Sequence, residues 1–178
     1  MTTSSNNMKL VARDITVIAI SAAIMFALKM AMVWLPNIHF GALLIIVYTL
    51  VYGRKVFYIV YLYVMLEIAV FGFNPMWSIG YLYVWSLLAV LAWFMRRMEN
   101  PWGWAVLSGV FGLSFGALMA PPFLLIAFET ERFWQSFLPY WISGIPYDIA
   151  HAVGNFFICL FLWKPLKTLL TKLCHREK

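Results

Sequence analysis

Residues 139–167 read PYWISGIPYDIAHAVGNFFICLFLWKPLK, a membrane-length apolar stretch that contains Asp148, His151 and Asn155. At about 100° per residue, these three positions fall within roughly 60° of one another around a helix. An aspartate inside a bilayer costs on the order of 2.5 to 3.5 kcal/mol, so such groups face a cavity or a partner. We therefore expect a polar stripe that lines a solute pocket. The alternative is a buried Asp–His pair that neighbouring helices satisfy, with no ligand.

The composition is that of an integral membrane protein. The chain has 178 residues, of which 64% are hydrophobic and only 11% are charged, whereas soluble domains carry about 25% charged residues. Beyond the polar start at residues 1–7 there is no linker or low-complexity tract, so residues 1–178 are expected to form a single membrane domain. The net charge of +6 suggests nucleic acid, but its distribution points to membrane topology instead.

Six segments are long enough to be membrane helices, since a helix needs about 20 apolar residues to cross the hydrocarbon core. The expected fold is an all-α bundle with short loops. The first segment is too long for a signal peptide and lacks a convincing cleavage site. The six expected spans are roughly 12–35, 38–53, 56–74, 77–95, 103–127 and 139–163.

The basic residues define an orientation. Given six spans, every lysine and arginine except Lys29 and Arg132 falls on one side. Cytoplasmic loops carry the excess of such residues, so both termini are expected in the cytoplasm. The residues on that side are Lys9, Arg13, Arg54, Lys55, Arg96, Arg97, Lys164, Lys167, Lys172, Arg176 and Lys178.

Three ionisable residues are expected at similar depth in the outer half of the bundle: Lys29, Glu67 and Asp148. They form either a structural clamp or the floor and wall of a binding site, with Lys29 paired to either carboxylate. Lys29 also lies close enough to the outer boundary to extend its ammonium to the interface instead. His39 lies in the outer connection 35–40 (LPNIHF), where a lid would be, and is either interfacial or part of the site.

An aromatic stripe, Trp77, Tyr81 and Trp85, recurs every four residues in the fourth segment. Such rings suit a flat heteroaromatic ligand or a cation. The alternative is the belt of Trp and Tyr found at membrane boundaries. The belt better explains Trp77, whereas Tyr81 and Trp85 lie too deep for it.

Small residues mark two helix-packing faces. Ala19, Ala23 and Ala27 lie four apart in the first segment and let another helix approach closely, inside the chain or from a partner. The fifth segment has a second such face before Pro121–Pro122, which break regular hydrogen bonding and hint at a cavity. Its residues are Ala105, Gly109, Gly112, Gly116 and Ala120.

No catalytic or metal-binding pattern accompanies these features. The chain has neither CxxC nor HExxH, so no metal and no cofactor is expected. Cys159 and Cys174 are about 22 Å apart along a helix, beyond the reach of a disulfide. His151 and Asp148 could pair, but no activated nucleophile joins them, so the protein is not expected to be an enzyme.

The chain resembles the substrate-binding S component of energy-coupling-factor (ECF) transporters, which import vitamins and related micronutrients in prokaryotes. The resemblance covers nearly the whole chain. It depends on six spans with both ends inside, on AISAAIMFA in the first span, and on the final GIPYDIAHAVGNFFICLFLWKPL.

This resemblance implies a six-helix S-component bundle in the prokaryotic cell membrane, with the ligand near the extracytoplasmic side under the loop after helix one. It also implies that Ala19, Ala23 and Ala27 face the membrane coupling subunit of a module with two ATP-binding-cassette ATPases. The chain has no GxxxxGK[ST] phosphate loop, so ATP hydrolysis would come from those partners.

The family does not fix the substrate, because its members share a fold and differ in the pocket. The aromatic and polar residues favour a nitrogen heterocycle such as a pyrimidine or pyridine compound, with cobalamin as another option. The expected substrate-binding residues are Lys29, His39, Glu67, Tyr81, Trp85, Asp148, His151 and Asn155.

Two other functions remain open. A non-transport scaffold subunit could share the helical bundle, but it would not need three ionisable side chains at one depth. A small transporter that works alone would be expected to carry an internal inverted repeat, which this short chain lacks.

Overall fold

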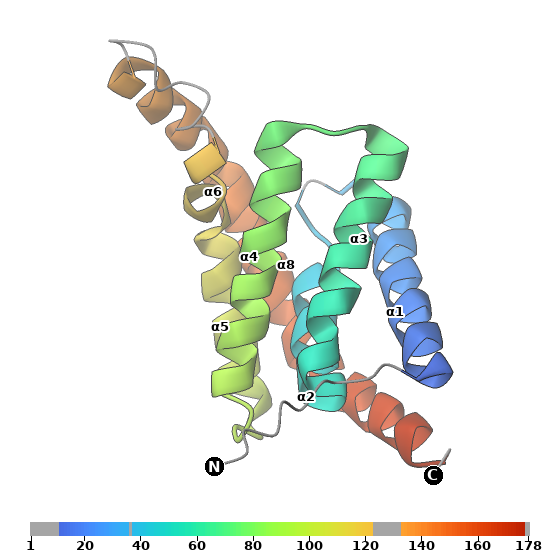
Figure 1. Ribbon diagram of the computed structural model, residues 1–178. Coiled ribbons are helices and arrows are strands. Elements are labelled where there is room, and N and C mark those ends of the chain that lie inside the picture. Colours follow the sequence, from blue (N-terminus) through green and yellow to red (C-terminus); the bar gives the residue numbers. More distant parts are fainter. Residues whose placement is uncertain (1–10, 36, 123–132, 177–178) are drawn as a thin grey trace, which may run out of the picture.

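The computed structural model describes residues 11–35, 37–122 and 133–176, and the regular secondary structure of these residues is helical (Figure 1). The elements are α1 (Ala12–Ala31), α2 (Gly41–Tyr52), the 3₁₀ turn η1 (Gly53–Lys55), α3 (Val56–Phe71), α4 (Pro75–Phe94), α5 (Pro101–Leu113), α6 (Phe115–Leu118) and α8 (Phe133–Arg176).

The sequence explains where these helices begin and end. Asn74 caps α4 by accepting hydrogen bonds from the N–H groups of Met76 and Trp77, and Asn100 caps α5 in the same way. In both helices a proline follows the cap, where its missing N–H costs nothing. Gly53 and Gly72 end α2 and α3 with φ of 61° and 82°, a backbone region that glycine adopts without a steric penalty.

Four helical stretches are long and apolar enough to cross a membrane within the described part of the chain: Ala12–Ala31, Gly41–Phe71, Pro75–Phe94 and Phe137–Cys174. The second contains both α2 and α3. Alone, α2 has 12 residues, about 18 Å at 1.5 Å per residue. A multi-pass membrane protein fits this pattern, and the count of six spans stays a prediction.

Two expected spans differ from the observed helices. The fifth, expected over 103–127, is divided at Ser114 into α5 and the short α6, and its end lies outside the described residues. The sixth, expected over 139–163, belongs to a helix of 44 residues that contains Pro139, Pro146 and Pro165. The chain therefore continues as helix well beyond the apolar stretch.

Helix α2 lies at the centre of the bundle, because positions 42–49 are all buried. It packs against α4 and α8, while α1 packs on α3 and α5 packs along α8. In Figure 1, α1, α3 and α4 stand side by side. A helix that is buried on every side can be apolar all round, which is what GALLIIVYTLVY provides.

Glycines bring α5 and α8 together. A Cβ atom added to Gly112 would lie 2.9 Å from the backbone carbonyl carbon and oxygen of His151, and one added to Gly109 would lie 3.4 Å from the Ala152 oxygen. The predicted close-packing groove is therefore confirmed at these two glycines. Segment 123–132, which follows Pro121–Pro122, lies outside the described residues.

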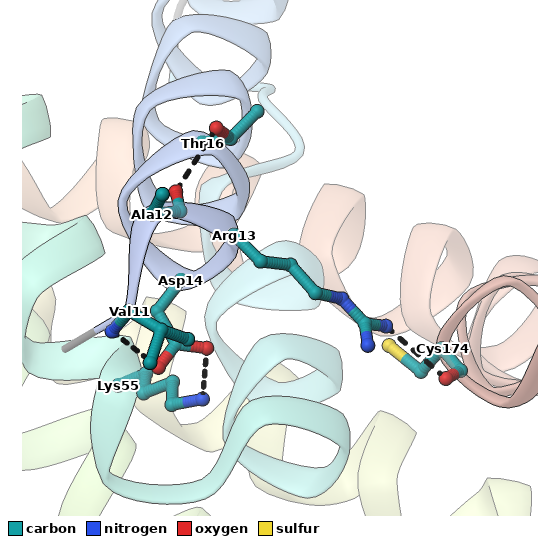
Figure 2. Close-up of polar contacts among 7 residues, drawn as sticks. All are labelled: Val11, Ala12, Arg13, Asp14, Thr16, Lys55 and Cys174. Atoms are coloured by element: carbon teal, nitrogen blue, oxygen red, sulfur yellow. Dashed lines mark hydrogen bonds and ion pairs between the residues drawn. The ribbon is translucent and has the colours of Figure 1, made fainter. Parts of the chain in front are cut away.

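The basic residues gather at one end of the bundle. Arg13 donates a hydrogen bond to the carbonyl of Cys174 at 3.3 Å, and Lys55 forms an ion pair with Asp14 (Figure 2). The start of α1, the turn after α2 and the end of α8 thus meet. Along α1, Lys29 lies about 24 Å from Arg13. We call this the basic end. The membrane side that it faces stays a prediction.

Candidate functional site

An ion pair joins α1 and α3 at the end of the bundle opposite the basic end. The Lys29 ammonium contacts Glu67 Oε2, and the Glu67 side chain is only 10% exposed. The structure thus answers the question that the sequence left open, because Lys29 pairs with Glu67. Two charges removed from water stabilise each other only if they remain together.

Aromatic rings surround the Lys29 ammonium. Its nitrogen lies 5.1 Å from the centre of the Tyr81 ring and 5.6 Å from that of Phe71, both within the range of a cation–π interaction. Tyr81 in turn stacks on Tyr63, with ring centres 6.5 Å apart. The charged pair therefore lies in an aromatic setting built by α3 and α4.

A cavity of about 410 Å³ opens at this ion pair. We call it the outer cavity. It combines a cation, a carboxylate, two amides and two hydroxyls with aromatic walls, so it offers hydrogen-bond donors and acceptors to one ligand. Its lining residues are Lys29, Val33, Asn37, Val64, Glu67, Phe71, Gly72, Asn74, Trp77, Ser78 and Tyr81.

The sequence did not single out Asn37 or Asn74 as site residues. Asn74 carried a signal, because an Asn directly before Pro75 is typical of a helix start. Asn37 has φ of 55°, and Asn is one of the few residues that tolerate this conformation. Trp77, which the sequence assigned to the aromatic belt at the membrane boundary, is half exposed and also lines the outer cavity.

A second group of expected site residues forms an aromatic cluster deeper in the bundle. The ring of His39 contacts those of Trp85 and His151, with centres 5.7 Å and 4.8 Å apart. Phe115 packs against His151 at 4.8 Å. Tyr81 contacts Trp85 at 5.8 Å and so connects this cluster to the outer cavity.

His39 lies between α1 and α2, and its ring points into the bundle. Its Nδ1 accepts a hydrogen bond from the Gly41 N–H at 3.2 Å. Burial, together with the nearby His151 and Lys29, lowers the pKa of His39 to about 3. The imidazole is therefore neutral at physiological pH, so it can both donate and accept a hydrogen bond.

The cluster holds polar atoms without partners. Both ring nitrogens of His151 and the indole nitrogen of Trp85 have no hydrogen-bond partner among the described residues, and each side chain is only 1% exposed. An unsatisfied buried polar group costs about 1 to 3 kcal/mol. The described protein therefore leaves the hydrogen-bonding capacity of these three nitrogens unused.

Asp148 and Asn155 connect α8 to its neighbours. Asp148 Oδ1 accepts a hydrogen bond from the Gly116 N–H at 3.0 Å, and the Asn155 amide donates to the Ser108 carbonyl at 3.5 Å. Both residues and His151 are buried, so the expectation that they share an inward face of the last helix is confirmed.

The expected common hollow for Lys29, Glu67 and Asp148 is corrected by the structure. Asp148 does not line the outer cavity, because α8 presents it to α6 whereas Lys29 and Glu67 come from α1 and α3. The expected site thus consists of two neighbouring groups that meet through Tyr81 and Trp85. Among the described residues, no group of three or more His, Cys, Asp or Glu side chains is placed to hold a metal ion.

The chain was compared with protein-family models, curated proteins and solved structures, and nothing in any of the three matched it.

Proposed function

We propose that this protein is the substrate-capturing membrane subunit of an ATP-driven, ECF-type importer, and that it binds a vitamin or vitamin precursor in the outer cavity. The main support for the proposal is the Lys29–Glu67 ion pair, which borders a cavity lined by aromatic side chains. Charged groups inside a membrane protein typically mark a path or site for a solute.

The dimensions of the outer cavity favour a small ligand. Its volume of about 410 Å³ lies near the lower end of the roughly 300 to 1,000 Å³ typical of small-molecule sites. A single pyrimidine or pyridine ring with substituents fits this space better than the much larger cobalamin. Tyr81 and Trp77 offer stacking surfaces, and Asn74, whose amide oxygen caps α4, offers its amide N–H groups to acceptors of the ring.

His39 gives this proposal a link between the cavity and the connection after α1. The connection carries Asn37, which lines the outer cavity, and His39, which contacts Trp85 and His151. A ligand that contacts Asn37 would therefore touch the segment that also places His39 in the aromatic cluster. In the proposal, a shift of this connection on ligand binding moves the His39 ring against His151 in the core of the bundle.

The exposed face of α1 supports docking to a coupling subunit. Ala19, Ala23 and Ala27 are exposed, whereas Ala22 and Met25 on the same helix are buried against the bundle. Small residues on a lipid-facing surface let a partner helix approach closely. In this proposal that partner is the membrane subunit of a module with two ATPases, and the basic end faces the cytoplasm of a prokaryotic cell.

A non-transport scaffold is the second candidate, because a scaffold also needs an exposed small-residue face. It does not need a cavity with a charged pair at its centre. Ligand binding therefore separates the two functions.

The test is a binding screen on the purified protein in lipid nanodiscs. We expect one nitrogen-heterocyclic vitamin or precursor, from a panel that includes pyrimidine, pyridine, flavin and corrinoid compounds, to bind with a measurable heat. Glu67→Gln and Tyr81→Leu should weaken that binding at least tenfold. Glu99→Gln and Tyr58→Leu are matched controls, because Glu99 and Tyr58 lie outside the outer cavity.

Circular dichroism and size-exclusion chromatography establish that each variant folds. Absence of binding across the whole panel by a folded wild-type protein would contradict the importer and favour the scaffold. An equal loss of affinity in the site variants and the control variants would show that the ligand does not bind in the outer cavity.

A further inference from the structure

A second hollow, of about 600 Å³, lies at the basic end. We call it the basic hollow. The end of α2, the segment that follows α4, and α8 form it together. Its lining residues are Thr49, Leu50, Val51, Tyr52, Gly53, Trp93, Arg96, Arg97 and Lys167.

Three cations line the basic hollow, and no carboxylate does. Arg96, Arg97 and Lys167 form no ion pair with a carboxylate of the described residues. Glu99, the nearest acidic residue in the sequence, lines a neighbouring hollow with Lys164 and Lys172, and Lys167 borders both hollows. No acidic side chain lines the basic hollow itself, so no carboxylate within it offsets the charges of Arg96 and Arg97.

Aromatic rings hold two of the cations. The guanidinium carbon of Arg96 lies 4.3 Å from the centre of the Trp93 ring, and the Lys167 ammonium lies 4.8 Å from that of Trp163. Such contacts use the face of the ring and leave the N–H donors available. The cations are thus positioned without being neutralised.

The backbone at the end of α2 does not cancel this charge. A helix C-terminus is equivalent to about −0.5 of an elementary charge. Three unit positive charges exceed it several-fold, so the basic hollow attracts an anion. Arginine is suited to phosphate in particular, because its planar N–H fork binds two phosphate oxygens together.

An apolar groove of about 780 Å³ runs along α3 and α4. Leu82, Ser86 and Val90 line it at four-residue intervals on α4, and Trp93 continues the same helix face. The groove thus approaches the basic hollow along one side of α4. An acyl chain in a groove and a phosphate at its end are the two parts of one phospholipid.

We infer that the basic hollow binds the phosphate of an anionic phospholipid from the membrane leaflet at that end, with an acyl chain along the α3–α4 groove. Arg96, Arg97 and Lys167 bind the headgroup. Basic pockets between membrane helices recognise anionic headgroups in this manner. The site lies at the end of the molecule opposite the outer cavity and is independent of the proposed transport function.

The test is native mass spectrometry of the full chain, released from nanodiscs that contain equal amounts of phosphatidylglycerol and phosphatidylcholine. We expect phosphatidylglycerol to be retained at least fivefold more than phosphatidylcholine. Arg97→Gln and Arg96→Gln should each reduce that preference at least threefold. Arg54→Gln is the matched control, because Arg54 is exposed at the same end and lines neither the basic hollow nor the groove.

A thermal-shift titration of the detergent-solubilised protein separates a lipid from a free phosphate. We expect phosphatidylglycerol to raise the midpoint of unfolding and inorganic phosphate at the same concentration to leave it unchanged. An equal rise with both would show a phosphate site and overturn the lipid assignment. Equal retention of the two lipids, or the same loss of preference in Arg54→Gln as in Arg97→Gln, would also overturn it.

Discussion

Two lysine–carboxylate pairs fasten α1 to the α3 region, one at each end of α1, and they differ in everything except their chemistry. Lys29 of α1 pairs with Glu67 of α3, whereas Lys55, directly before α3, pairs with Asp14 of α1. The donor is on α1 in the first pair and the acceptor is on α1 in the second. Since α1 packs mainly on α3, these two pairs fix where α1 lies along its neighbour.

The surroundings of the two pairs assign them different roles. Glu67 is an α3 residue buried between aromatic rings, and the pair borders the outer cavity. Asp14 lies at the first turn of its helix, where a negative charge is favoured, and is surrounded by the charged residues of the basic end. The lysine and carboxylate side chains are 27% and 10% exposed in the Lys29–Glu67 pair and 31% and 17% exposed in the Lys55–Asp14 pair. The less exposed carboxylate, with aromatic rings around it, is the more costly one to leave without its cation. Position, rather than the pair itself, thus determines its importance.

The largest effect is expected from breaking the inner pair. Lys29→Met leaves the Glu67 carboxylate buried without its cation, which should lower the free energy of unfolding by about 3 kcal/mol. The double variant Lys29→Met/Glu67→Met should recover most of this loss, because no lone charge remains. Thermal unfolding in nanodiscs, followed by circular dichroism, measures both. A double variant that is less stable than the single one would show that the pair itself supplies the stability.

A smaller effect is expected at the basic end. Lys55→Met should lower the free energy of unfolding by less than about 1 kcal/mol, because the remaining Asp14 carboxylate stays close to water and to the helix N-terminus. The same unfolding assay applies, repeated at high salt, where the difference from wild type should shrink. If Lys55→Met lowered the free energy of unfolding as much as Lys29→Met does, the two ion pairs would not differ in their contribution to stability.

The smallest effect is expected on the face of α1 that neither pair touches. Ala23→Trp should change the free energy of unfolding by no more than about 0.5 kcal/mol, because Ala23 is exposed and points away from α3. Ala22→Trp is the matched control. Ala22 is 0% exposed, and its overpacking should cost about 1 to 3 kcal/mol or more. Equal losses in the two variants would contradict the orientation of α1.

Much of this molecule could be predicted from residue spacing. Each predicted apolar segment contains helix, although α2 and α5 are shorter and α8 is longer than the predicted spans. The breaks at Gly53 and Gly72 follow from glycine chemistry, and the inward face of the last helix follows from its three polar residues. The glycine spacing in the fifth segment likewise predicted a face for close helix packing, although not that α8 is the helix that packs there. Each of these features depends on residues near one another in the chain.

The partner of each polar residue could not be predicted in this way. Periodicity indicates that Lys29, Glu67 and Asp148 face inward, but it does not indicate which helix each of them meets. Gly116 illustrates the difficulty, because its backbone N–H is the hydrogen-bond partner of the Asp148 carboxylate. Gly116 belongs to α6, which a break at Ser114 separates from α5, and no apolar pattern marks that break.

The sequence alone determined that the protein is helical, with apolar segments compatible with a multi-pass membrane protein, and it predicted that all basic residues except Lys29 and Arg132 lie on one side, because hydropathy and charge act through composition and local spacing. Only the tertiary structure decided that the polar residues divide into an outer cavity and a deeper aromatic cluster. That division depends on which helices pack together, and packing is set by contacts between side chains far apart in the chain.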